Sequence, residues 1–300
     1  MLPIETGREI DHMLAEPIHD MGTAEFVSAF RARIVRVTVR GVCAPDETVF
    51  LADAFRGAVG HVLLEQASPE AREGMPCPWR PACALDVLWR ERPFTAGMSL
   101  PKPVNFAIEP GRMSTDLVIR LFGLAQGWST TIAEAAVRAV RKGIRARNGS
   151  VVPCEVTDVG TEEIAGLSAP PATFARIEFR TPLRWRSQTS DGFDPGLFLS
   201  MLGNRLSGLA RWHGVLLQAP WQDVRTRATD LRWDLDALHP TDMARRSGRQ
   251  MRNFSAEAWS GRIDVTGAFG FLADLLLLGS LSGAGSNAAL GLGVYDLEWC

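Results

Sequence analysis

The chain has 300 residues, 46% of them hydrophobic and 22% charged, and its formal net charge is −2. This composition excludes a disordered chain, and the length suits one large domain or two of ordinary size. The near-neutral total gives no sign of nucleic-acid binding, but residues 173–252 hold 13 Arg and 8 acidic residues. Arginine suits bidentate phosphate contacts, although the codon bias of a GC-rich genome would produce the same excess.

The cysteines and the apolar stretches indicate a protein of the reducing cytoplasm. The five cysteines form an odd set without dense spacing, which is not typical of a disulfide scaffold. The N-terminus lacks the apolar run of a secretory signal, and residues 269–281 are too few to span a bilayer. Cys77 and Cys83 are six positions apart, which is not a standard zinc spacing, so we expect neither a metal nor another cofactor and no membrane partner.

The first half of the chain predicts the order β-α-β-β-α-β after a polar lead-in at residues 1–25. Alternating Val35, Val37 and Val39 indicate a half-buried strand. After the first helix, residues 68–103 form an irregular stretch rich in Pro and Cys. The other expected elements are a helix at 49–66, strands at 104–108 and 117–122, a helix at 131–142 that ends before Gly143, and a strand at 151–159.

The same order begins again after residues 160–171, which are rich in Gly, Ala and Pro. Two such halves define an α+β chain of two tandem ferredoxin-like (RRM-like) units. We place the units at residues 26–160, with the Cys- and Pro-rich insert, and at 172–300, with a C-terminal glycine-rich loop. The second unit is expected to contain strands at 174–179, 231–235, 263–265 and 294–299 and helices at 195–213 and 269–281.

The glycine-rich loop does not fit a nucleotide-binding motif. Residues 283–288 imitate a dinucleotide fingerprint, but that motif follows a strand and opens a helix within a longer unit. The chain ends at Cys300, too soon after Gly285 for such a unit, and the last expected strand lies between them. A Walker-type loop needs Gly-Lys-Ser/Thr, and the chain's two lysines are Lys102 and Lys142. Both phosphate-loop motifs are therefore excluded.

Six segments in chain order carry a resemblance to a known family. They are LADAFRGAVGHVL (51–63), MPCPWRPACALDVLW (75–89), KPVNFAIEPG (102–111), LVIRLFGLAQGW with AEAAVRAVRKGI, IEFRTPLRW (177–185), and WSGRIDVTG (259–267) followed by GLGVYDLEW (291–299). Together they resemble the CRISPR-associated endoribonuclease that trims precursor crRNA, the sixth of the Cas families, within the RAMP superfamily.

This resemblance implies a role for the glycine-rich loop. In the family, the backbone amides of this loop lie against the RNA backbone between the two ferredoxin-like units. Glycine suits that role because a phosphate can reach the N–H groups with no Cβ in the way. Family members often carry His, Lys or Arg here, whereas residues 283–287 are uncharged. The implied RNA-binding positions are Gly283, Gly285, Ser286, Asn287, Gly291 and Gly293.

The resemblance also implies metal-independent RNA cleavage. The ribose 2′-OH attacks the adjacent phosphorus, which leaves a 2′,3′-cyclic phosphate on one product and a 5′-OH on the other. This reaction needs a base, an acid and cations for the charged transition state, and histidine suits the proton transfers. Family members place a catalytic His in or just after the first helix, so His61 is the catalytic candidate. The alternative is a histidine that fills the edge between helix and sheet.

Other polar residues receive lesser roles. Arg56 lies about 140° from His61 on a helical wheel, so we expect it to bind phosphate or to pair with Asp53. His213 is expected to be a charge partner for the C-terminus of its helix, and His239 to lie in a loop. If every histidine is dispensable, an arginine site that stabilises charge is the fallback.

A basic run is the candidate for binding the stem of the RNA. Residues 243–252 contain four arginines and no acid, which fits either a solvated loop or a hairpin or short helix that grips an A-form stem. The nine tryptophans could stack on bases, but most fit a core equally well. The arginines of the run are Arg245, Arg246, Arg249 and Arg252, and Arg176, Arg180, Arg184 and Arg186 could extend the same surface.

The sequence therefore predicts an endoribonuclease that matures crRNA and stays bound to its stem-loop. The expected partners are CRISPR repeat RNA and other Cas effector subunits. One alternative is a non-catalytic RAMP subunit that holds crRNA as a scaffold. Another is a protein–protein adaptor on the same fold, which would show no salt-dependent RNA binding.

Overall fold

The computed structural model describes residues 5–40, 48–95, 98–145, 151–152, 154–184, 192–246 and 253–300. Its contacts divide the chain into two compact units. Unit 1 comprises Met1–Leu167, Ser207–Gln218 and Ala289–Gly291, and unit 2 comprises Ser168–Leu206, Ala219–Ala288 and Leu292–Cys300.

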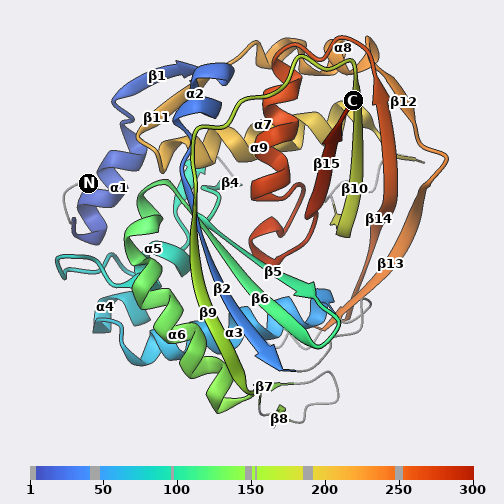
Figure 1. The fold of residues 1–300 in the computed structure, drawn as a ribbon. Helices are drawn as coiled ribbons and strands as arrows, with labels where there is room; N and C mark the ends of the chain where they lie inside the picture. Colours follow the sequence, from blue (N-terminus) through green and yellow to red (C-terminus); the bar gives the residue numbers. More distant parts are fainter. Residues whose placement is uncertain are drawn as a thin grey trace. The chain divides into compact units, whose positions relative to one another are not determined.

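Unit 1 is built on a four-stranded antiparallel sheet in the order β5-β6-β2-β9 (Figure 1). With two helices on one side it has the β-α-β-β-α-β order that the sequence predicts. Val35, Val37 and Val39 are buried on one face of the central strand, as their alternation predicts. The elements are β2 (Ala32–Arg40), α3 (Thr48–Glu65), β5 (Val104–Pro110), β6 (Ser114–Phe122), α6 (Ser129–Lys142) and β9 (Val156–Ile164).

The segment before β2 is folded, whereas a polar lead-in was expected. It forms α1 (Gly7–Ala15), β1 (His19–Gly22) and α2 (Thr23–Ala29), and β1 pairs in parallel with β11 (Val215–Gln218). Five large apolar side chains of this segment are buried: Ile10, Leu14, Phe26, Val27 and Phe30. Each of the two helices buries only two of these side chains, and most of its other positions are at least partly exposed. This is why the composition of the segment looks polar.

The Cys- and Pro-rich insert is also folded, around a buried charge cluster. Asp86 is fully buried and pairs with Arg90 and Arg92, which both also reach Asp11. A buried carboxylate requires such partners. The insert contains α4 (Pro69–Arg72), α5 (Ala84–Trp89), β3 (Pro93–Thr95) and β4 (Met98–Ser99). The other small elements of unit 1 are η2 (Gly123–Trp128), β7 (Ile144–Arg145) and β8 (Val151–Val152).

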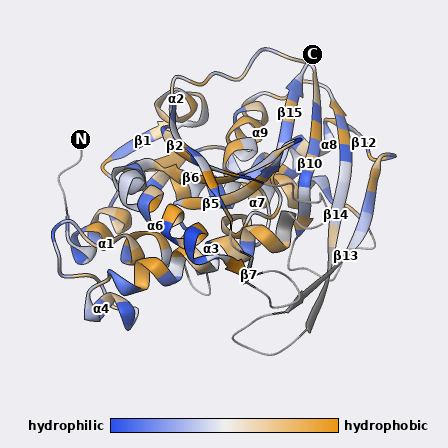
Figure 2. Cartoon of the chain, turned by 60° about the horizontal axis from the view of Figure 1, so that its bottom comes forward, coloured by the Kyte–Doolittle hydropathy of each residue, from blue (hydrophilic) through white to orange (hydrophobic). Residues whose placement is uncertain are grey.

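Unit 2 repeats the architecture with the strand order β12-β14-β10-β15, and β13 pairs with β14. The predicted fold class, α+β with two tandem ferredoxin-like units, is confirmed. Strand β10 alternates buried and exposed positions, and Figure 2 shows the corresponding hydrophilic and hydrophobic bands along it. The elements from residue 168 on are β10 (Phe174–Arg184), α7 (Pro195–Arg211), η3 (Trp221–Asp223), α8 (Val224–Thr229), β12 (Arg232–Asp234), β13 (Leu238–Arg246), β14 (Asn253–Thr266), α9 (Phe271–Ser282), η4 (Ala288–Leu290) and β15 (Tyr295–Trp299). Of these, the end of α7 from Ser207 and the end of η4 from Ala289 belong to unit 1.

The apolar residues of α7 and α9 recur at helical spacing because they form the core of unit 2. Leu202 and Phe198 of α7 and Leu276 of α9 are fully buried. Tyr295, the single tyrosine, is buried with them, and its hydroxyl donates to the Leu276 carbonyl at 2.7 Å. No helix within the described residues is both long enough and apolar enough to cross a membrane.

Candidate nucleic-acid interface

The glycine-rich loop begins where α9 ends and is held by backbone hydrogen bonds, within itself and to β10. Ala284 N–H donates to the Gly293 carbonyl at 2.8 Å, and Ser286 N–H donates to the Arg184 carbonyl at 2.7 Å. Within the described part of the chain, the N–H groups of Gly285 and Asn287 donate to no backbone carbonyl. Of the expected phosphate-binding amides, these two are therefore the ones that can reach an anion.

The glycines of the loop are required by the protein itself. A Cβ on Gly285 would lie 2.4 Å from the Arg184 carbonyl oxygen, and one on Gly293 would lie 2.1 Å from that of Ala284. Both glycines have positive φ, 74° and 62°. The sequence interpretation assigned these glycines to close approach by RNA. The structure adds a reason within the protein, because carbonyl oxygens occupy the space that a Cβ on Gly285 or Gly293 would need.

A buried arginine that the sequence interpretation missed holds the start of this loop. Arg205 of α7 is 9% exposed, and its Nε and Nη2 donate to the Ser282 carbonyl at 3.0 and 2.7 Å. Burial lowers the pKa of Arg205 to about 10, so it stays charged at neutral pH. Its charge compensates the carbonyl end of α9. Its spacing of three residues from Leu202 is the signal that places Arg205 on the buried face of α7.

One face of α3 contacts the residues of the loop that belong to unit 1. A Cβ on Gly291 would lie 3.2 Å from Ala52 Cβ. One turn further along, the Arg56 guanidinium lies 5.3 Å from the centre of the Trp89 ring. Another turn on, a Cβ on Gly60 would lie 2.8 Å from Trp89 Nε1. The stripe Ala52–Arg56–Gly60, which we call the Arg56 face, is therefore packed against the loop and Trp89.

His61 lies on the other side of α3. It is nine residues from Ala52, which turns it about 180° from the side chain that contacts the loop. His61 is exposed and lies one turn before Glu65. Glu65 binds Lys142 of α6 at 2.7 Å, and this hydrogen bond lowers the pKa of Glu65. The structure does not bring His61 to Gly291, and we call the surface of His61 and Glu65 the His61 face.

Two other histidines have roles different from those expected. His213 stacks on Phe30 at 4.9 Å, its Nδ1 donates to the Leu209 carbonyl at 3.1 Å, and its Nε2 accepts from the Arg31 N–H at 3.3 Å. Burial lowers the pKa of His213, so it is neutral at pH 7 and is a packing residue, which corrects the expected charge partner of the helix. His239 lies in strand β13 opposite Ser260, whereas a loop was expected.

The basic run, residues 243–252, begins in β13 where this strand pairs with the start of β14. Arg245 and Arg246 lie in β13, opposite Phe254 and Asn253 of β14. Arg249 and Arg252 lie outside the described residues, as does Arg186. The backbone thus places the first two arginines at the end of an antiparallel strand pair.

The expected extension of this basic surface across β10 is wrong for two arginines. Arg176 makes two 2.9 Å hydrogen bonds to the Asp264 carboxylate on β14, and these raise the pKa of Arg176. Arg180 pairs with Asp296 of β15. The outer face of this sheet is therefore a surface of ion pairs. Sequence alternation predicts which residues point outward, but strand register decides that each arginine meets an aspartate.

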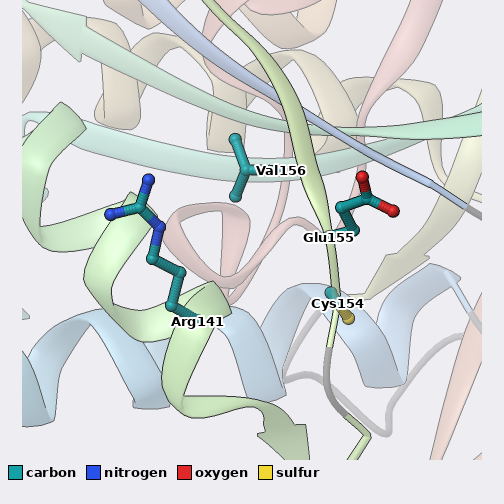
Figure 3. A pocket seen from close by; sticks show the side chains of 4 residues that line it. All are labelled: Arg141, Cys154, Glu155 and Val156. Atoms are coloured by element: carbon teal, nitrogen blue, oxygen red, sulfur yellow. The ribbon is translucent and has the colours of Figure 1, made fainter.

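A hollow in unit 1 lies between the end of α6 and the start of β9. Figure 3 shows its lining side chains, Arg141, Cys154, Glu155 and Val156. Glu155 pairs with Arg40 at 3.3 Å, and burial raises the pKa of Cys154, which keeps the thiol protonated. This hollow lacks an activated nucleophile. Among the residues that the structure describes, no three His, Cys, Asp or Glu side chains gather as a metal site.

Comparisons with known proteins agree with this fold. The chain is an α+β protein of two ferredoxin-like units with a glycine-rich loop before the last strand. The model of the family described as CRISPR-associated endoribonuclease Cas6 matches residues 177–295, which confirms the family resemblance seen in the sequence. This match covers β10 through the start of β15 and includes the loop.

Solved Cas6 structures share the fold over nearly their whole length. Two structures of Cas6 product complexes each match with a TM-score of 0.53, at 18% and 19% identity, over 89% of this chain and 99% of theirs. Thermus thermophilus Cas6 matches with a TM-score of 0.52 at 16% identity, over 90% of this chain and 99% of its own. A search of curated proteins gives no match. At these identities the structures establish the fold.

Proposed function

We propose that this chain is a metal-independent endoribonuclease that cleaves CRISPR repeat RNA to mature crRNA. The products carry a 2′,3′-cyclic phosphate and a 5′-OH, and the protein stays bound to the stem-loop. The observation that carries the proposal is the match of the Cas6 family model to residues 177–295, the part of the chain that contains the glycine-rich loop. The two ferredoxin-like units of this chain and the fold shared with a solved Cas6 product complex support it.

In this proposal the RNA backbone lies along the glycine-rich loop, at residues 283–287 and at Gly291 and Gly293. The N–H groups of Gly285 and Asn287 support this, because they donate to no backbone carbonyl in the described chain. Ser286 and Asn287 add polar side chains. Arg56 supplies a cation next to Ala52, which contacts Gly291.

The stem of the repeat is bound by the basic run, Arg245, Arg246, Arg249 and Arg252. A pair of antiparallel strands carries its first two members, and A-form stems are recognised mainly through phosphate and shape. Changing Arg245, Arg246 and Arg249 to Gln should weaken stem binding and flatten its dependence on salt. Equal affinity across the salt range would refute this part of the proposal.

His61 is the proposed group for proton transfer at the 2′-OH. Its exposure leaves the imidazole accessible to RNA. Because His61 and the contact with Gly291 lie on different faces of α3, the scissile phosphate and the phosphates on the loop would belong to different nucleotides.

We further propose that the protein acts in the cytoplasm with other Cas effector subunits as partners, and that residues 26–160 and 172–300 are its two domains.

A cleavage assay with end-group analysis tests the function. A repeat-containing RNA should be cut in EDTA to a 2′,3′-cyclic phosphate and a 5′-OH. A 2′-deoxy substitution at the scissile nucleotide should block the cut, because it removes the attacking group. Tight, salt-dependent binding without any cut would instead identify the chain as a crRNA-binding scaffold, and absence of binding would identify it as neither.

A further inference from the structure

Lys102, which neither the family match nor the sequence interpretation assigns to a role, lies in a partly buried charge cluster. It precedes β5, and its Nζ lies 2.7 Å from Glu91 Oε1. The two partners differ in exposure, since the Lys102 side chain is 16% exposed and that of Glu91 is 67% exposed. The carboxylate is thus the outer member of the pair, and an incoming anion can replace it without moving the lysine.

A second cation lies close to this pair. Burial lowers the pKa of Lys102, and the charge of Arg56 lowers it further. Against the effect of burial, the hydrogen bond from Lys102 lowers the pKa of Glu91, and the charge of Arg56 adds to this. Two cations near each other repel each other, and an anion that binds both relieves the repulsion. The charge of Arg92 also lowers the pKa of Lys102, and its guanidinium pairs with Asp11 and Asp86.

The cluster is rigidly built. Trp89 lies under the Arg56 guanidinium and packs edge-on against Phe106 at 5.7 Å. Gly60 brings α3 into contact with the Trp89 indole. A guanidinium stacked on a ring keeps its N–H edge in a fixed plane, which suits a phosphate. One turn away, Ala52 contacts Gly291 of the loop.

We propose that Arg56 and Lys102 together form a binding site for a phosphate of the RNA backbone, and that this phosphate displaces Glu91 from Lys102. The site supplies the cations that residues 283–287 lack. This inference rests on the proposed function, since it names a contact of the same RNA. It involves binding alone, so no bond is made or broken at this site.

The test measures the affinity for a repeat RNA that carries the 2′-deoxy substitution, over a range of salt concentrations. Lys102→Gln should weaken binding about tenfold at low salt and reduce the slope of log K against log salt by about 0.7. Lys102→Arg should restore most of the affinity. The matched control is Lys142→Gln. Lys142, the chain's other lysine, lies at the end of α6 and pairs with Glu65 of α3, and the variant should bind RNA as the wild type does.

Glu91→Gln separates this inference from a structural role of the pair. If a phosphate competes with the Glu91 carboxylate, removing the carboxylate's charge should tighten RNA binding two- to fivefold. If the pair merely stabilises the fold, both Lys102→Gln and Glu91→Gln should weaken binding and lower the melting temperature together. That parallel loss, or wild-type affinity and salt slope in Lys102→Gln, overturns the inference.

Two further outcomes are distinguished by the same experiment. Wild-type protein that binds no repeat RNA contradicts the proposed function itself, independently of Lys102. Inorganic phosphate is titrated into wild type and Lys102→Gln by calorimetry. A Lys102-dependent signal for inorganic phosphate, together with unchanged RNA affinity in the variant, would mean that the site takes a free anion and would overturn the inference.

Discussion

The two faces of α3 differ although they belong to one helix. On the Arg56 face, each turn contacts protein, first Gly291 through Ala52, then Trp89 through Arg56 and Gly60. On the His61 face, the polar side chains face solvent and the last turn of α6 through Glu65 and Lys142. The helix is apolar over much of its circumference, so its sequence alone does not say which of these polar residues lies near the loop.

The comparison teaches that a residue type suited to a reaction can lie apart from the surface that binds the substrate. His61 has the side chain that RNA cleavage calls for, whereas the Arg56 face has the contact with the loop. We therefore expect the His61 face to control the rate of cleavage and the Arg56 face to control RNA affinity. Each of the following experiments separates the two faces or their surroundings, in order of decreasing effect.

The largest effect is expected from His61→Ala. Loss of a general base should lower the single-turnover cleavage rate at least about a hundredfold and leave the affinity for repeat RNA nearly unchanged. The control is His12→Ala, which removes an exposed histidine of α1 that pairs with Glu16. If His61→Ala cuts at the wild-type rate, the chemistry belongs to a cationic site, and the Arg56 face is the place to seek it.

His213 sharpens the comparison because it is the buried counterpart of His61. Replacing it by Leu removes the hydrogen-bonding ring between Arg31 and Leu209 and should cost about 1–3 kcal/mol of unfolding free energy at pH 7.5. Urea unfolding measures this loss, and His61→Ala should be within about 0.5 kcal/mol of the wild type.

The same variant has an expected pH dependence. Burial puts the folded-state pKa of His213 below its ordinary value, so unfolding takes up a proton between the two pKa values. The stability contributed by His213 is therefore complete above pH about 6.5 and declines as pH falls towards the folded-state pKa. The stability difference between wild type and His213→Leu should narrow from pH 7.5 to pH 5. A constant difference would contradict the assignment of His213 as a buried neutral ring.

Two glycines of α3 give the smallest and most direct comparison of its sides. Gly60→Ala places a Cβ 2.8 Å from the Trp89 indole and should destabilise the protein by about 1–3 kcal/mol. Gly57→Ala meets nothing within 4 Å and should stabilise it by about 0.4–1 kcal/mol, because alanine restricts the unfolded chain. Thermal unfolding of the two variants should move in opposite directions. Equal shifts would mean that Gly60 does not pack against Trp89.

The order of elements could be predicted from the sequence because it depends on local periodicity. The alternation of Val35, Val37 and Val39 predicted β2, and helical spacing with Gly143 predicted α6, which ends at Lys142. The elements before β2 were missed, because α1 and α2 each bury too few apolar side chains for composition to reveal them. The strand between these two helices, β1, pairs with β11, which comes far later in the chain.

The sites were less predictable because they depend on contacts between distant segments. Arg205 appears in the sequence as one more arginine of a basic region, yet its position on the buried face of α7 makes it the support of Ser282. Arg176 appears as part of a basic surface, yet the register of β10 against β14 pairs it with Asp264. Neither contact leaves a local signature.

By itself, the sequence determined the two β-α-β-β-α-β units and the family they resemble, because strand alternation, helical spacing and short motifs are properties of neighbouring residues. The tertiary structure decided which face of α3 contacts the loop, which arginines are neutralised, and why the loop glycines cannot carry a Cβ. These depend on register and on carbonyls contributed by other strands, such as that of Arg184 against Gly285. Distances between segments far apart in the chain exist only once the chain has folded.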